Sequence, residues 1–145
     1  MPIDQLDPVA AFARLRDEPG TIYLDVRSSA EYDQGHPVDA WNLPLLHMTP
    51  AGMTPNAEFE EVAEAVLPRD VLILVGCRSG QRSQQACQVL SQLGFERLAN
   101  VAGGFAGQAD PMSGRVLAPG WQTCGLPDTA EPTPARSWED LRRKL

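Results

Sequence analysis

Short apolar runs alternate with segments of helical periodicity along most of the 145 residues of this chain. The apolar runs with the composition of buried strands are 22–26 (IYLDV), 41–45 (WNLPL), 71–75 (VLILV) and 96–101 (ERLANV). Because helical segments fill the intervals, this order predicts an α/β fold with a parallel sheet covered by helices on both faces. Ligands of such folds lie beyond the carboxyl ends of the strands.

The helical segments carry start and stop signals. Asp7 is an N-cap before a proline, Ser28 and Glu31 have the spacing of a capping box, and Gly94 follows the longest segment as a C-cap. These signals and the apolar periodicity predict four helices, over about residues 8–16, 28–34, 56–67 and 79–93.

Composition and charge narrow the possible functions. The formal net charge of −7 argues against nucleic acid and anionic membranes as partners. The longest purely apolar run, residues 71–75, is too short for a membrane span, and the N-terminus lacks the form of a signal peptide, so a cytoplasmic location is expected. The cysteines (Cys77, Cys87 and Cys124) and the histidines lack metal-ligand spacing, so we expect free thiols, no metal and no cofactor.

A cysteine stands at the junction of the most apolar strand and the longest helix, in the stretch 75–83 (VGCRSGQRS). The backbone N–H groups of a loop that opens a helix converge on one point, and Cys77 lies there. Arg78 and Arg82 add two cations, and such surroundings favour a nucleophilic thiolate. A buried, inert cysteine is the alternative, but it explains neither the glycine nor the two arginines.

The length of this loop indicates what the thiolate attacks. Four residues separate Cys77 from Arg82, whereas cysteine phosphatases have one residue more, which makes a ring of amides wide enough for phosphate. The smaller ring suits a single sulfur atom bonded to the cysteine better than it suits phosphate oxygens. The sequence therefore favours sulfur transfer.

Taken together, these motifs resemble those of single-domain rhodaneses, a sulfurtransferase family, over about residues 3–104. The segments that carry the resemblance are LDVRSSAEYDQGH (24–36), AWNLPL (40–45), VGCRSGQRS (75–83) and LGFERLANVAGGF (93–105). The resemblance implies a rhodanese-like fold with a mostly parallel sheet of about five strands. The rhodanese-like domain is then expected to span residues 1–127, with residues 121–127 as its closing segment.

Three further segments complete the predicted organisation. Residues 46–55 (LHMTPAGMTP) and 106–120 are expected to be loops, and 106–120 is an insertion relative to the family that is expected to form a flap or partner surface. Residues 128–145 are predicted to be a proline-rich tail ending in a helix over 137–145. The face of that helix formed by Trp138, Leu141 and Leu145 is expected to dock on the domain.

The resemblance also implies a ping-pong reaction. The Cys77 thiolate attacks the outer sulfur of thiosulfate or another sulfane-sulfur donor, sulfite leaves, and the Cys77 persulfide passes its sulfur to a thiol, cyanide or a protein cysteine. The backbone N–H groups of the loop stabilise the anionic sulfur, and arginines suit an anionic donor. The predicted substrate-binding residues are Arg78, Ser79, Gly80, Gln81 and Arg82.

Four residues are expected to support the loop. In the family, the aspartate matched by Asp25 accepts N–H groups of the active loop, and the arginine matched by Arg27 pairs with a carboxylate, here Glu31. Glu31 can also serve its capping box, and Ser83 completes the loop motif.

The remaining polar residues and two other functions complete the expectations. His36 is interpreted as a hydrogen-bonding residue that fixes a loop, Cys87 as a core residue, and Cys124 as the better candidate for a second redox thiol. A persulfide carrier that relays sulfur between partner proteins is the alternative function. A phosphatase or arsenate reductase is disfavoured by the short loop.

Overall fold

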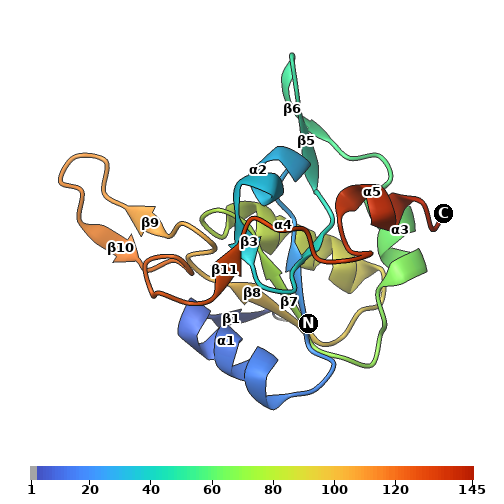
Figure 1. Cartoon of the computed structure of the whole chain (residues 1–145), viewed down its shortest axis with the longest axis horizontal. Helices are drawn as coiled ribbons and strands as arrows, with labels where there is room; N and C mark the ends of the chain where they lie inside the picture. The colour runs from blue at the N-terminus through green and yellow to red at the C-terminus, as the bar shows by residue number, and fades with distance from the viewer. Residues whose placement is uncertain (1–2) are drawn as a thin grey trace.

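The computed structural model describes residues 3–145, and a five-stranded sheet lies at its centre (Figure 1). The strands run in the order β1 (Asp4–Leu6), β8 (Leu98–Val101), β7 (Ile73–Gly76), β2 (Ile22–Asp25) and β4 (Trp41–Asn42). Every neighbouring pair is parallel. The predicted α/β fold with a parallel sheet of about five strands is confirmed.

Helices cover both faces because successive residues of each central strand point to opposite sides. Leu24 and Val75 belong to a core cluster with α3 (Phe59–Val66), α4 (Gln81–Gln92) and α5 (Trp138–Arg142). Tyr23 and Leu74 belong to a second cluster with α1 (Pro8–Asp17) and α2 (Ser29–Gln34). Across residues 3–145, no helix is both long and apolar enough to cross a membrane.

The predicted loop at residues 46–55 is wrong, because this segment is a β-hairpin. β5 (Leu46–Thr49) pairs antiparallel with β6 (Gly52–Pro55). Gly52 takes a positive φ of 102° in the turn, and the Thr49 hydroxyl donates to its carbonyl at 2.9 Å. Neither proline prevents the pairing, because Pro50 lies in the turn and Pro55 is the last residue of β6, opposite Leu46.

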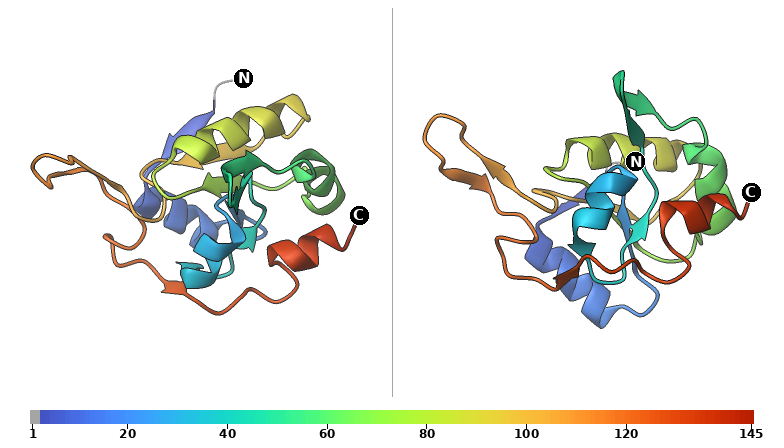
Figure 2. Two further views of the ribbon diagram at one scale, coloured as in Figure 1. Left: turned by 90° about the horizontal axis from the view of Figure 1, so that it is seen from above. Right: turned by 45° about the horizontal axis from the view of Figure 1, so that its top comes forward.

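The segment 106–120 also contains a hairpin where a loop was predicted. β9 (Gln108–Ala109) pairs antiparallel with β10 (Val116–Ala118). Two views show that this β9–β10 hairpin projects away from the body of the molecule (Figures 1 and 2). The edge strand β1 was likewise not predicted, since its sequence, Asp-Gln-Leu, has no apolar alternation.

The C-terminal tail packs against the domain, as predicted. β11 (Asp128–Thr129) pairs with β3 (His36–Pro37), and the tail then runs past α2 to place α5 beside α3 (Figure 1). Trp138 and Leu141 are buried in the core. The helix ends at Arg142, however, and leaves Leu145 55% exposed, so the prediction that Leu145 docks is wrong.

Candidate active site

The Cys77 loop, residues 76–83, consists of the last residue of β7, the turn after it and the first turn of α4. The helix begins at Gln81, later than the predicted start at Ser79, because Gly80 acts as its N-cap with a left-handed φ of 108°. Glycine adopts this conformation without a steric penalty. The turn brings the Gly80 N–H within 3.0 Å of Cys77 Sγ, and Cys77 is only 1% exposed.

The carbonyl groups of the Cys77 loop are bound from outside by the chain that follows β8. Three successive carbonyls each accept one hydrogen bond: Cys77 from Phe105 N–H at 2.8 Å, Arg78 from Ala106 N–H at 2.9 Å, and Ser79 from Gln108 Nε2 at 3.2 Å. The C=O and N–H of a trans peptide unit point in opposite directions. Outward carbonyls therefore turn the N–H groups of residues 78–80 away from that chain segment, and the Gly80 N–H is the one that binds the sulfur.

Gly104 allows this close approach. Its φ is 59°, and a Cβ on Gly104 would collide with the backbone of Cys77 and Arg78. The contact that shapes the Cys77 loop thus explains the glycine at position 104, whereas a Cβ on Gly103 would collide with the carbonyl of Pro119.

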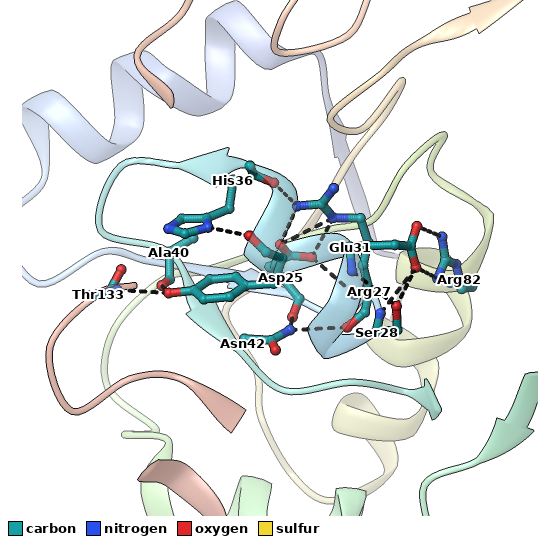
Figure 3. Close-up of polar contacts among 11 residues, drawn as sticks. Asp25, Arg27, Ser28, Glu31, His36, Ala40, Asn42, Arg82 and Thr133 are labelled. Carbon is teal, nitrogen blue, oxygen red and sulfur yellow. Dashed lines mark hydrogen bonds and ion pairs between the residues drawn. The ribbon is translucent and has the colours of Figure 1, made fainter. Parts of the chain in front are cut away.

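Arg27 pairs with Asp25, and the predicted pairing of Arg27 with Glu31 is wrong. Arg27 Nη2 lies 2.7 Å from Asp25 Oδ2 and Nε lies 3.0 Å from Oδ1, with both side chains almost fully buried (Figure 3). Two buried charges this close neutralise each other. The Asp25 carboxylate accepts only from Arg27 among the bonds found in residues 3–145, so the role of binding loop N–H groups is not fulfilled either.

Glu31 instead binds Arg82 on α4. The two nitrogens of the Arg82 guanidinium lie 2.7 and 3.0 Å from the two Glu31 oxygens, and Glu31 also closes the predicted capping box with Ser28 (Figure 3). Burial opposes ionisation of Glu31, but the ion pair and the hydrogen bonds from Ser28 outweigh it and lower the pKa of Glu31 to about 2. This pair ties α2 to the first turn of α4.

These pairs leave the three arginines around the loop in different states. Arg27 and Arg82 are each neutralised by a carboxylate, whereas Arg78 is exposed and makes no ion pair with any residue in the described part of the chain. Arg78 lines a hollow of about 350 Å³ together with Phe105 and Gln122. Arg78 is therefore the cation available to an anionic ligand.

The side chains of His36, Cys87 and Cys124 make no hydrogen bond to the Cys77 loop among those found in residues 3–145. His36 is fully buried, its Nδ1 lies 2.7 Å from the Tyr32 carbonyl, and its ring stacks on Tyr32, which confirms its interpretation as a fixing residue. Cys87 is buried in the core as predicted, and burial raises the pKa of its thiol to about 12. Cys124 is half-buried.

Two polar side chains that the sequence analysis did not single out form hydrogen bonds with the Cys77 loop. Gln108, which lies in the insertion, donates to the Ser79 carbonyl, and Asn100 of β8 binds the Ser83 hydroxyl. Asn100 is only 4% exposed, and a polar residue inside the otherwise apolar strand Leu98–Val101 is the signal that identifies it. Within residues 3–145, no group of three or more metal-ligating side chains is assembled.

Several curated proteins are similar in sequence to this chain. Thiosulfate sulfurtransferase 18 of Arabidopsis thaliana is 42% identical over 94 residues, which cover 63% of this chain and 68% of that protein. A protein named sulfurtransferase from Allochromatium vinosum is 34% identical over 103 residues, 71% of this chain and 85% of that protein. Protein HIGH ARSENIC CONTENT 1, mitochondrial, of Arabidopsis thaliana is 33% identical over 91 residues, 63% of this chain but 54% of that protein. The chain thus spans about half the length of some curated relatives.

Solved structures and a family match agree with the fold. The crystal structure of Rv0390 from M. tuberculosis has a TM-score of 0.76 and 29% sequence identity, with 90% of this chain and 100% of that chain covered. The Rhodanese-like domain family matches residues 9–109. Since this match includes the whole Cys77 loop and every strand of the central sheet except β1, the protein belongs to the rhodanese-like domain family.

Proposed function

We propose that the protein is a sulfurtransferase that takes a sulfane sulfur from an anionic donor such as thiosulfate and carries it as a Cys77 persulfide. The observation behind the proposal is the Gly80 N–H, 3.0 Å from Cys77 Sγ, in a loop whose carbonyls are bound from outside. N–H groups held in this way stabilise an anionic sulfur as an oxyanion hole stabilises oxygen. Relatives named thiosulfate sulfurtransferase and sulfurtransferase support the same chemistry.

The reaction has two displacement steps and needs no external oxidant or reductant. The Cys77 thiolate attacks the outer sulfur of thiosulfate, a new S–S bond forms, and the bond to the sulfonate sulfur breaks so that sulfite leaves with the electron pair. Cyanide or an acceptor thiolate then attacks the terminal sulfur of the persulfide. The Cys77 thiolate leaves with the electron pair of the broken S–S bond and is ready for the next cycle.

Arg78 is the residue that we propose binds the sulfonate group of the donor. It is exposed and unpaired in the described chain, while the charges of Arg27 and Arg82 are committed to Asp25 and Glu31. A guanidinium binds such an oxyanion through paired hydrogen bonds. Because Cys77 is 1% exposed, side chains around the loop must move before the outer sulfur of the donor reaches Sγ.

Intact mass spectrometry tests the proposal. Thiosulfate should add the mass of one sulfur atom to the wild type, cyanide should remove it, and Cys77→Ser should gain nothing although Cys87 and Cys124 are still present. The proposal is overturned if the wild type takes up no sulfur while the pure protein hydrolyses an aryl phosphate or reduces arsenate. Arsenate belongs among the test substrates because of the name of one relative.

A persulfide carrier is the second candidate, and the β9–β10 hairpin favours it. The base of the hairpin contacts the Cys77 loop through Gln108, while Met112, Val116 and Leu117 are 94%, 58% and 63% exposed. Apolar side chains presented beside a reactive loop suit a protein acceptor. Under this reading, turnover with thiosulfate and cyanide is slow, and replacing the exposed apolar residues reduces transfer to a protein but not to cyanide.

A further inference from the structure

A network of hydrogen-bonded side chains leads from Cys77 to a groove that Arg78 does not line. Its links are Cys77 Sγ to Ser83 Oγ at 3.4 Å, Ser83 Oγ to Asn100 Oδ1 at 2.5 Å, Asn100 Nδ2 to Gln5 Oε1 at 2.8 Å, and Gln5 Nε2 to Gln84 Oε1 at 2.6 Å. Ser83 and Asn100 are buried, and the three amide side chains line a groove of about 680 Å³. Gln5 and Asn100 are partners in the register of β1 and β8, so the sheet itself holds this link.

The positions of the protons in this hydrogen-bond network determine whether the Ser83 hydroxyl presents its proton or a lone pair to the sulfur of Cys77. The Asn100 amide nitrogen faces two acceptors, Gln5 Oε1 and the Gly80 carbonyl at 3.4 Å, so its oxygen faces Ser83. Two oxygens 2.5 Å apart need a proton between them, and only the Ser83 hydroxyl has one. Ser83 therefore presents a lone pair to Cys77, which suits a protonated thiol as donor and opposes a thiolate.

The same chain has a second arrangement with the opposite effect. The two ends of a carboxamide exchange donor and acceptor roles when the group turns over. If Gln84, Gln5 and Asn100 all turn over, Asn100 Nδ2 donates to Ser83 and the hydroxyl proton of Ser83 is free to bind the sulfur. This arrangement is the less favourable one, because the Asn100 oxygen then faces the Gly80 carbonyl oxygen where the amide nitrogen had donated to it at 3.4 Å.

We propose that Asn100 is a positioning residue that sets, through Ser83, the ease with which Cys77 becomes a thiolate or an anionic persulfide, with Gln5 and Gln84 as the outer links. The inference deepens the proposed function and rests on it for its catalytic meaning. Removing the oxygen of Asn100 frees the Ser83 proton for the sulfur, so the thiolate forms at lower pH.

The other titratable groups around Cys77 do not obscure this effect. Tyr23 of β2 and Arg82 and Cys87 of α4 interact electrostatically with Cys77, and Arg78 follows Cys77 in the sequence as an exposed cation that the variants of the test leave in place. Burial raises the pKa of Tyr23 and raises that of Cys87 to about 12, so both stay protonated near neutral pH. Arg82 keeps its charge in the pair with Glu31.

The test measures the ultraviolet absorbance of the Cys77 thiolate against pH, as the difference from Cys77→Ser. Asn100→Leu should shift the midpoint about one pH unit lower, a tenfold gain in thiolate below the midpoint, the size expected for one hydrogen bond to a charged group. Gln5→Leu, at an exposed position, should shift it by about half as much because Asn100 can then turn over. Gln85→Leu changes a residue that lines the same groove but is not part of the hydrogen-bond network, so it should leave the midpoint unchanged.

A double variant separates positioning from a general structural effect. In a Ser83→Ala background, Asn100→Leu should no longer move the midpoint, because the proton that it frees is absent. The inference is overturned if the shift persists without the Ser83 hydroxyl, or if folded Gln5→Leu keeps the wild-type midpoint. Neither outcome depends on sulfur uptake from thiosulfate, so failure here is distinct from failure of the proposed function.

Discussion

The Cys77 loop and the β9–β10 hairpin both look like loops in the sequence, and both contain glycines with positive φ, yet the structure treats them in opposite ways. In the Cys77 loop, the segment that follows β8 binds three successive carbonyls, and the thiol of Cys77 is buried. In the hairpin, Met112 at the tip is 94% exposed, and Gly114 has open space around it. A glycine with a positive φ is therefore packed against neighbouring backbone at the active site and left open at the tip of the hairpin.

The largest expected effect compares two glycines with similar backbones. Gly104→Ala should lower the free energy of unfolding by about 3 kcal/mol, because it adds a backbone collision with Cys77 and Arg78 to the strain of a positive φ. Gly114→Ala has a φ of 74° but no neighbour within 4 Å, so it should cost about 1 kcal/mol. Urea unfolding measures both, and sulfur uptake from thiosulfate should fall only in Gly104→Ala. Equal costs for the two variants would show that packing does not distinguish the regions.

The sequence was a good guide where a pattern is local or strongly apolar. The strand over 71–75, the capping box at Ser28 and the cysteine at a strand–helix junction all depend on neighbouring residues, and the structure has a strand, a capping box and a cysteine there. The two hairpins escaped prediction because their strands are only two to four residues long, and the prolines and glycines around them are typical of loops.

The charge pairing was the part of the site that the sequence left undetermined. Arg27 has a carboxylate two residues before it and another four residues after it, and either is within reach of its side chain. Which carboxylate pairs with Arg27 depends on Arg82. This residue lies 51 positions after Glu31 in the sequence, and its two terminal nitrogens bind the Glu31 carboxylate. Likewise, Asn100 can bind Ser83 only because the fold places β8 beside the first turn of α4, which the sequence does not indicate.

A medium effect is expected from the pair that fastens the Cys77 loop to α2. Glu31→Gln retains the capping box but loses the charge that holds Arg82, and should lower the free energy of unfolding at pH 7 by about 1 to 2 kcal/mol, allowing for partial solvation. Because the pKa of Glu31 in the folded protein is about 2, below its ordinary value of 4.5, the stabilisation is present above pH 4.5 and is lost as pH falls toward 2. Urea unfolding between pH 7 and about pH 3 should show the difference from wild type shrinking. A difference that is constant with pH would mean that the ion pair is not its source.

The smallest effect on stability is expected at the hairpin surface, where it also divides the two candidate functions. Leu117→Ser replaces a side chain that is 63% exposed, so the free energy of unfolding should change by less than about 0.5 kcal/mol and cyanide should remove sulfur from Cys77 at the wild-type rate.

Gln108→Ala, at the base of the same hairpin, should slow sulfur uptake because the Ser79 carbonyl loses its donor. If transfer to a protein thiol falls in Leu117→Ser while transfer to cyanide does not, the hairpin serves a protein acceptor and the carrier function is favoured. If both variants slow sulfur uptake from thiosulfate equally, the tip is as closely coupled to the Cys77 loop as the base, and the contrast between the two regions fails.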